Sequence, residues 1–190
     1  MDDSWKSAIG QNAPLVILSF LQTDSKIVNY NEELSSLSTL INRDINCNGL
    51  MMDTDDEGGL ETDGHLSSCI AMSMGDIQPS VQLQGPDEAA IQRVAEELRY
   101  IAAQLEHNVV AQATQNLSNN VLSSTTQYWK KHLSQEVDKA LRQGVCLRDL
   151  PQEQIIVALS LTLVKGVCQQ APHLLRNLFD IALDYIRRDF

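Results

Sequence analysis

Apolar residues recur at steps of three and four along most of the chain, which is the spacing of one face of an α-helix. Such steps predict one helix in the first quarter of the chain, over the positions Tyr30, Leu34, Leu37 and Ile41. Ahead of it, Pro14 is suited to open a short helix over residues 15–21. That apolar run taken alone also fits a buried strand, so periodicity leaves both structures open for it.

The helical pattern is clearest after residue 86. Asp87 is a suitable N-cap, and a single apolar stripe follows it at steps of three, four, three and four. The stripe consists of Ile91, Val94, Leu98, Ile101 and Leu105. A further helix is predicted to step by fours from Trp129 to Leu141, and Gly144 is a suitable residue to end it.

Residues 155–164 differ in kind because they are apolar on every side. A helix without a polar face is buried all round. Pro151 ahead of this run and Pro172 beyond it predict a helix over residues 151–170, about 30 Å long at about 1.5 Å per residue. A last helix with one broad apolar face is predicted from Pro172 to Phe190. Strand signals are nearly absent, so the predicted fold class is all-α, with a bundle of helices around one buried helix.

Residues 42–86 show no sustained period and are rich in Asp, Gly, Ser, Asn and Met. The dipeptides Asn48-Gly49, Gly58-Gly59 and Gly85-Pro86 break any regular element there. A stretch of this length without periodicity is typical of a functional or a disordered segment. We therefore predict a disordered regulatory loop over 42–86, within a single domain that spans residues 1–190.

The negative charge is concentrated in the first half of the chain. Apolar residues make up 43% of the sequence and the net charge is −11. Residues 1–87 contain fourteen acids and three bases, whereas residues 88–190 contain eleven of each. Nucleic-acid binding needs an excess of bases, so we exclude that class of partner. The acidic half has either a separate role or only a solubilising one.

No segment predicts export or membrane anchoring. The start of the chain lacks a basic region followed by an apolar one, and no run reaches about 18 apolar residues. The cysteines lack the paired spacing of metal sites. We therefore expect a cytoplasmic protein with free thiols.

Motifs for catalysis are missing or incomplete. The four histidines are scattered, and the chain has neither a Gly-rich phosphate loop nor a nucleophile elbow. Asp53, Asp55 and Gly58 resemble the first half of a calcium loop, but Gly64 stands where the bidentate Glu belongs. We expect no enzymatic activity, metal or cofactor.

Two other features carry more information. The stripe of residues 91–105 is typical of a core-facing helix, and equally of a helix that binds in a partner's groove. The predicted loop contains Leu60, Glu61, Thr62 and Asp63, followed by Gly64, as an accessible protease site. A second string of this kind, Leu21 to Ser25, lies at the end of the first predicted helix. We expect it to be cut poorly, because helices do not fit protease clefts.

Three segments, in one order, resemble a known family. Residues 94–101 resemble the third Bcl-homology motif (BH-three), and residues 60–64 resemble an initiator-caspase cleavage site. Residues 155–164, then 171–176 and Phe179, resemble a central apolar hairpin and the helix after it. Together they resemble the BH-three-only death agonists of the Bcl family. The resemblance implies a Bcl-like helical bundle around a buried central hydrophobic helix hairpin, with a long disordered loop.

The resemblance also implies roles for the stripe. Val94, Leu98, Ile101 and Leu105 would fill four pockets of a partner, with Ile91 as a preceding fifth anchor. Leu98 would dominate, and Ala102 occupies the position of a small residue. Ala103 departs from the family, which has an Asp there to pair with an Arg of the groove. That departure weakens the expected affinity, above all for anti-apoptotic Bcl relatives.

The mechanism implied by the resemblance begins with cleavage by an initiator caspase after Asp63. The larger fragment then moves to the mitochondrial outer membrane, where its helix activates Bax and Bak and cytochrome c is released. The new N-terminal Gly64 begins a myristoylation pattern, and cardiolipin is the expected lipid contact. Two alternatives stay open: direct insertion or pore formation by the hairpin of residues 155–190, and an inert or inhibitory bundle with a degenerate motif.

Overall fold

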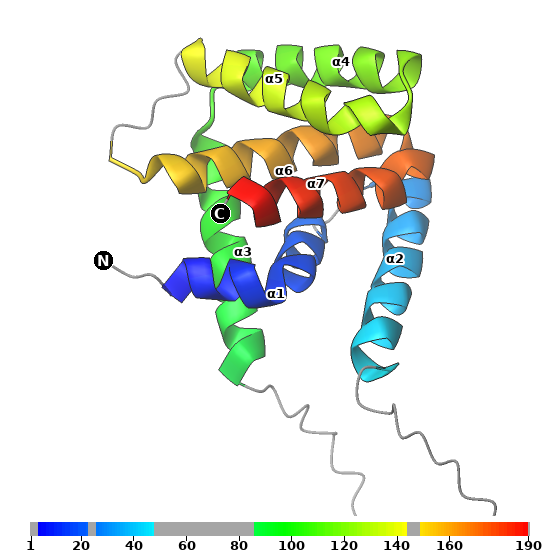
Figure 1. The fold of residues 1–190 in the computed structure, drawn as a ribbon, viewed down its shortest axis with the longest axis vertical. Helices are drawn as coiled ribbons and strands as arrows, with labels where there is room; N and C mark the ends of the chain where they lie inside the picture. The colour runs from blue at the N-terminus through cyan, green and yellow to red at the C-terminus, as the bar shows by residue number, and fades with distance from the viewer. Residues whose placement is uncertain (1–3, 23–25, 48–85, 144–148, 190) are drawn as a thin grey trace, which may run out of the picture.

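The computed structural model describes residues 4–22, 26–47, 86–143 and 149–189. Within these ranges every regular element is a helix, which confirms the predicted all-α fold class (Figure 1). The helices are α1 (Ser4–Leu21), α2 (Val28–Cys47), α3 (Pro86–Gln104), α4 (His107–Ser123), α5 (Trp129–Arg142), α6 (Gln152–Gln170) and α7 (Leu175–Asp189). Two single 3₁₀ turns, η1 (Thr126–Tyr128) and η2 (Pro172–Leu174), precede α5 and α7.

Helix α6 is the centre of the bundle. It contacts α1, α3, α4, α5 and α7, and most of its side chains are fully buried. Figure 1 shows α4 and α5 on one side of it and α1 and α3 on the other. The buried Ser160 keeps its hydrogen bond by donating to the carbonyl of Val157 at 2.8 Å. The prediction of an apolar helix buried on every side is confirmed.

Helices α6 and α7 form the predicted hairpin. The chain turns at Ala171 and η2, and α7 runs back beside α6. The apolar face of α7 is buried through Leu175, Leu178, Phe179, Ala182, Tyr185 and Ile186. No described helix is both long and apolar enough to cross a membrane.

Helix α1 begins ten residues before the predicted start. The segment 15–21 is helical rather than a strand, but the helix already begins at Ser4 and is kinked at Asn12 (φ −120°, ψ 25°). Proline has no N–H to give to the fourth residue before it, so Pro14 marks the break. The first half is held in the core by Trp5, Ala8 and Ile9, whose spacing the sequence analysis did not use.

Helix α4 has no counterpart among the predicted elements. Its buried residues are Ala113, Thr114, Leu117, Ser118 and Val121, which are mostly small or polar. Such a face gives little hydrophobic contrast, although Ala113, Leu117 and Val121 do follow helical steps.

Helix α2 continues to Cys47, so residues 42–47, which the sequence analysis assigned to the loop, are helical. In the sequence, Ile45 extends the apolar repeat one turn beyond Ile41, so the helical pattern continues past the predicted end of the helix. Residues 48–85, with most of the predicted loop, lie outside the described residues.

A close approach of α4 and α6 yields a prediction for stability. A Cβ at Gly166 would lie 2.6 Å from Cγ2 of Thr114. We expect Gly166→Ala to lower the free energy of unfolding by about 1–3 kcal/mol through overpacking, although alanine is the better helix former. Urea unfolding followed by circular dichroism measures this change.

Two matched variants separate the clash from a general effect. In a Thr114→Ala background the obstructing atoms are gone, so Gly166→Ala should be neutral or stabilising. Gly10→Ala, where a Cβ meets nothing within 4 Å, should raise stability by up to about 1 kcal/mol. Equal destabilisation by Gly166→Ala in both backgrounds would contradict the clash.

Candidate functional site

The predicted binding stripe is one continuous buried face along α3 and Leu105, the residue that follows the helix. Its residues are exposed by no more than 7%: Ile91, Val94, Leu98, Ile101 and Leu105. Ala102 is half-buried at the edge of the stripe and packs against the core. The structure therefore brings these six residues together, and it uses them as core residues of the bundle.

Helices α1 and α6 cover the stripe. The contact between α1 and α3 is the most extensive in the described part of the molecule, and α6 is the other helix in extensive contact with α3. The kink in α1 gives it two segments that follow the core at different angles. In this arrangement α1 and α6 occupy the faces that a partner's groove would need.

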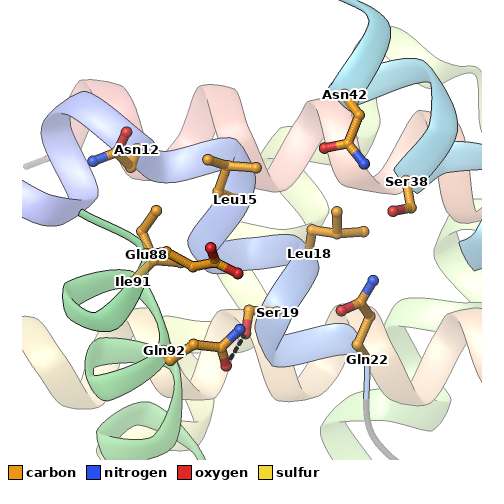
Figure 2. A pocket seen from close by; sticks show the side chains of 10 residues that line it. All are labelled: Asn12, Leu15, Leu18, Ser19, Gln22, Ser38, Asn42, Glu88, Ile91 and Gln92. Atoms are coloured by element: carbon orange, nitrogen blue, oxygen red, sulfur yellow. Dashed lines mark hydrogen bonds between the residues drawn. The ribbon is translucent and has the colours of Figure 1, made fainter. Parts of the chain in front are cut away.

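A cleft borders the first residue of the stripe. It has a volume of about 550 Å³ and lies between α1, α2 and α3. Figure 2 shows its lining: Asn12, Leu15, Leu18, Ser19, Gln22, Ser38, Asn42, Glu88, Ile91 and Gln92. The hydroxyl of Ser19 donates to Oε1 of Gln92 at 3.0 Å, which closes one side of the cleft (Figure 2). The cleft thus opens between α1 and α3 beside Ile91, which is itself buried.

The α1–α3 contact is polar where α1 ends, beside this cleft. The guanidinium of Arg99 donates to the carbonyl oxygen of Ser19, and also to that of Gln22 at 3.5 Å. These acceptors lie at the C-terminal end of α1, where the last carbonyls of a helix lack partners within the helix. A cation is also favoured there by the helix dipole.

Helix α2 completes this arrangement. The hydroxyl of Tyr30 donates to the carbonyl oxygen of Leu21 at 3.0 Å. Burial raises the pKa of Tyr30, and nearby Cys168 adds to the rise, so the phenol stays protonated and can donate. We call the side chains of Arg99 and Tyr30, with the α1 carbonyls that they bind, the α1 C-terminal cap.

A second cation lies beside the cap. Nζ of Lys165, on α6, is 6.0 Å from the centre of the Phe20 ring. Burial lowers the pKa of Lys165, and the positive charge of Arg99 lowers it further. Two half-buried cations, Arg99 in the cap and Lys165 beside it, therefore lie at the end of α1.

The outer face of α3 is charged and open to solvent. Arg93, Glu96 and Glu97 are exposed, and Tyr100 is 66% exposed. Ala103, which the resemblance marks as a departure from the motif, is exposed as well.

The sequence analysis did not find Arg99 and Tyr30 as interacting residues. Arg99 lies off the apolar stripe of its helix, and Tyr30 was predicted only as part of an apolar repeat. Their acceptors are main-chain oxygens of distant residues, for which the sequence carries no local signal.

Other predicted sites lie outside the described residues. These are the cleavage site Leu60, Glu61, Thr62, Asp63 and Gly64, and acylation at Gly64. In the described ranges, no group of three or more His, Cys, Asp or Glu residues is placed to hold a metal ion.

The chain matches the family model described as BH3 interacting domain (BID) over residues 9–190. A Gallus gallus protein named BH3-interacting domain death agonist is 28% identical over 142 residues, which are 72% of this chain and 68% of that protein. A Mus musculus protein of the same name is 24% identical over 139 residues, with the same coverage of both chains. No solved structure matches the chain significantly.

The family model covers all seven helices except the first residues of α1. It includes the buried stripe of α3, which carries the residues of the BH-three resemblance. This chain therefore belongs to the BH3 interacting domain (BID) family of pro-apoptotic regulators.

Proposed function

We propose that this chain is a non-enzymatic trigger of apoptosis that is switched on by proteolysis. The stripe of α3 is its binding surface for Bcl-family partners, namely Bax and Bak and the anti-apoptotic relatives. The observation that carries the proposal is the burial of the whole stripe beneath α1 and α6. A binding helix in this position is inactive until its cover is removed.

Cleavage after Asp63 would act on this cover. Helices α1 and α2 precede residue 63, and helices α3 to α7 follow it. After the cut, α1 would be held on the stripe by non-covalent contacts alone. The initiator caspase thus converts an intramolecular contact into a contact between two fragments, which can dissociate.

The division of charge supports transfer of the larger fragment to the mitochondrial outer membrane. Residues 1–63 contain twelve acids and three bases, whereas residues 64–190 contain thirteen acids and eleven bases. Anionic lipid such as cardiolipin repels the first fragment strongly and the second little. Loss of the acidic fragment would remove an electrostatic barrier as well as the cover of the stripe.

Acylation at Gly64 would add a membrane contact. The new N-terminus reads Gly-His-Leu-Ser-Ser, which fits the myristoylation pattern. One myristoyl chain gives only marginal membrane binding, so a second contact is needed. The apolar α6 is a candidate for this contact.

The apolar α6 also favours a second candidate function, in which the α6–α7 hairpin itself inserts into the membrane and permeabilises it. Leakage from liposomes that contain no Bax or Bak would support this function. Leakage only after Bax or Bak is added would support the first.

The first prediction from this proposal concerns the switch. Isolated mitochondria should release cytochrome c when given the caspase-treated protein, and not when given the intact protein. Asp63→Ala should abolish release after treatment, because the peptide bond at the loop stays intact. Asp24→Ala is the matched control and should leave release unchanged, since Leu21 of that second string is buried at the end of α1.

Two outcomes would contradict the proposal. Release by treated Asp63→Ala would place the switch elsewhere. An absence of release by every sample, with cleavage confirmed by mass spectrometry, would favour the inert bundle with a degenerate motif.

A second prediction concerns the stripe as a binding surface. A peptide of residues 86–106 should bind an anti-apoptotic Bcl relative, and Leu98→Ala should weaken binding by about 2–4 kcal/mol, as truncation of a central anchor does. The peptide is used because Leu98 is 1% exposed in the intact chain, where the same change would also destabilise the fold. Isothermal titration calorimetry measures the affinities.

Ala103→Asp tests the departure from the family in the same assay. The substitution should strengthen binding, because the new carboxylate would pair with the Arg of the partner's groove. It should leave the stability of the intact chain nearly unchanged, because Ala103 is exposed. Gln104→Asp, a neighbouring exposed position, is the control for added charge. Equal effects of the two substitutions would show that the groove does not read residue 103.

A further inference from the structure

The α1 C-terminal cap joins segments that are far apart in the sequence. Arg99 lies 80 residues from Ser19 and 77 from Gln22, the two residues whose carbonyls it binds. Two other carbonyls at the end of α1 have hydrogen-bond partners that are closer in sequence. The carbonyl of Leu18 accepts from the Gln22 amide at 2.9 Å, and that of Leu21 accepts from the Tyr30 hydroxyl. Among these cap bonds, those of Arg99 are the ones that tie α3 to α1.

The cap is also incompletely satisfied. Nε of Arg99 is buried and has no hydrogen-bond partner among the described residues. A buried donor without a partner is costly, because it has lost its water. The guanidinium thus gives up part of its hydrogen bonding in order to reach the end of α1.

Lys165 opposes Arg99 in the same place. It approaches from α6, above the ring of Phe20, and the two cations act on each other through a poorly solvated region. No ion pair between Lys165 and a described carboxylate accompanies this approach. Like charges near one another are unfavourable, and burial strengthens the repulsion.

We infer that Arg99 is a latch that holds the α3 stripe against α1, and that Lys165 limits the strength of this latch. Arg99 supplies charged hydrogen bonds that close the contact, while Lys165 keeps it releasable. The latch is a regulatory device for the stripe, and its biological consequence rests on the proposed function. The contact itself does not, since it lies within the intact chain.

Hydrogen–deuterium exchange of the full chain, read by mass spectrometry, tests the latch without any partner. Arg99→Met keeps most of the side-chain stem and removes the donors. It should speed exchange of the amides of residues 91–101 by about tenfold or more, as expected for loss of a charged hydrogen bond. Arg93→Met, on the exposed face of the same helix, is the matched control and should leave exchange there unchanged.

Lys165→Glu gives the opposite expectation. It replaces repulsion by attraction to Arg99, so exchange over residues 91–101 should slow, and Lys165→Gln should have a smaller effect in the same direction. In an Arg99→Met background, Lys165→Glu should lose this protective effect. The pair thereby reports on the interaction rather than on either side chain alone.

Several outcomes overturn the inference. These are equal exchange in Arg99→Met and Arg93→Met, a uniform rise over all helices in Arg99→Met, or faster exchange over residues 91–101 in Lys165→Glu. If Arg99→Met does not fold, Arg99→Lys takes its place; it keeps the charge but replaces the planar guanidinium with a compact ammonium, and should raise exchange by a smaller factor.

A second measurement separates the latch from the proposed function. After cleavage, the fragment pair with Arg99→Met should dissociate faster than the unsubstituted pair, and that with Lys165→Glu more slowly. Unchanged exchange in the intact chain overturns the latch, whatever the fragments do. Altered exchange with no release of cytochrome c upholds the latch and overturns the proposed function.

Discussion

The apolar stripe of α3 can be buried in only one place at a time. Its five aliphatic side chains lie in the core, and each such burial contributes about 1.5–3 kcal/mol relative to exposure in water. Leaving the core for solvent is therefore prohibitive, and leaving it for another apolar groove is not. The core restrains α3 by providing an apolar surface of the kind that a partner's groove would provide. The core and the partner would therefore compete for the stripe.

The cover and the stripe have different positions in the sequence. Helix α1 contributes the most extensive contact with α3, while α6 remains on the same side of residue 63 as the stripe itself. Removing the segment before residue 63 therefore takes away one wall of the site and leaves the other. Under the proposed function, a partner that binds the released α3 would compete with α6 alone, so a single cut would change the availability of a helix distant from it.

The parts of this architecture that the sequence reveals are those with strong apolar contrast. The stripe of α3 and the all-round apolar α6 were predicted because Leu, Ile and Val recur there at helical steps. Helix α4 was missed because Thr114 and Ser118 occupy its buried face. The first half of α1 was not predicted because proline commonly stands at the start of a helix, whereas Pro14 lies inside this one. The α1 C-terminal cap was beyond prediction, since its acceptors are main-chain atoms placed by tertiary packing.

Some positions of the candidate site would serve both folding and partner binding, and others would serve partner binding alone. Under the proposed function, Leu98 and Ile101 would have to fit both the core of this molecule, where they are 1% and 0% exposed, and the pockets of a partner. Ala103 is exposed in the intact fold, so under the same proposal only the partner would constrain it. A charge at residue 103 can therefore change without loss of stability, whereas a change at Leu98 alters folding and binding together. The departure from the family falls at the kind of position where affinity for partners can be adjusted independently of the fold.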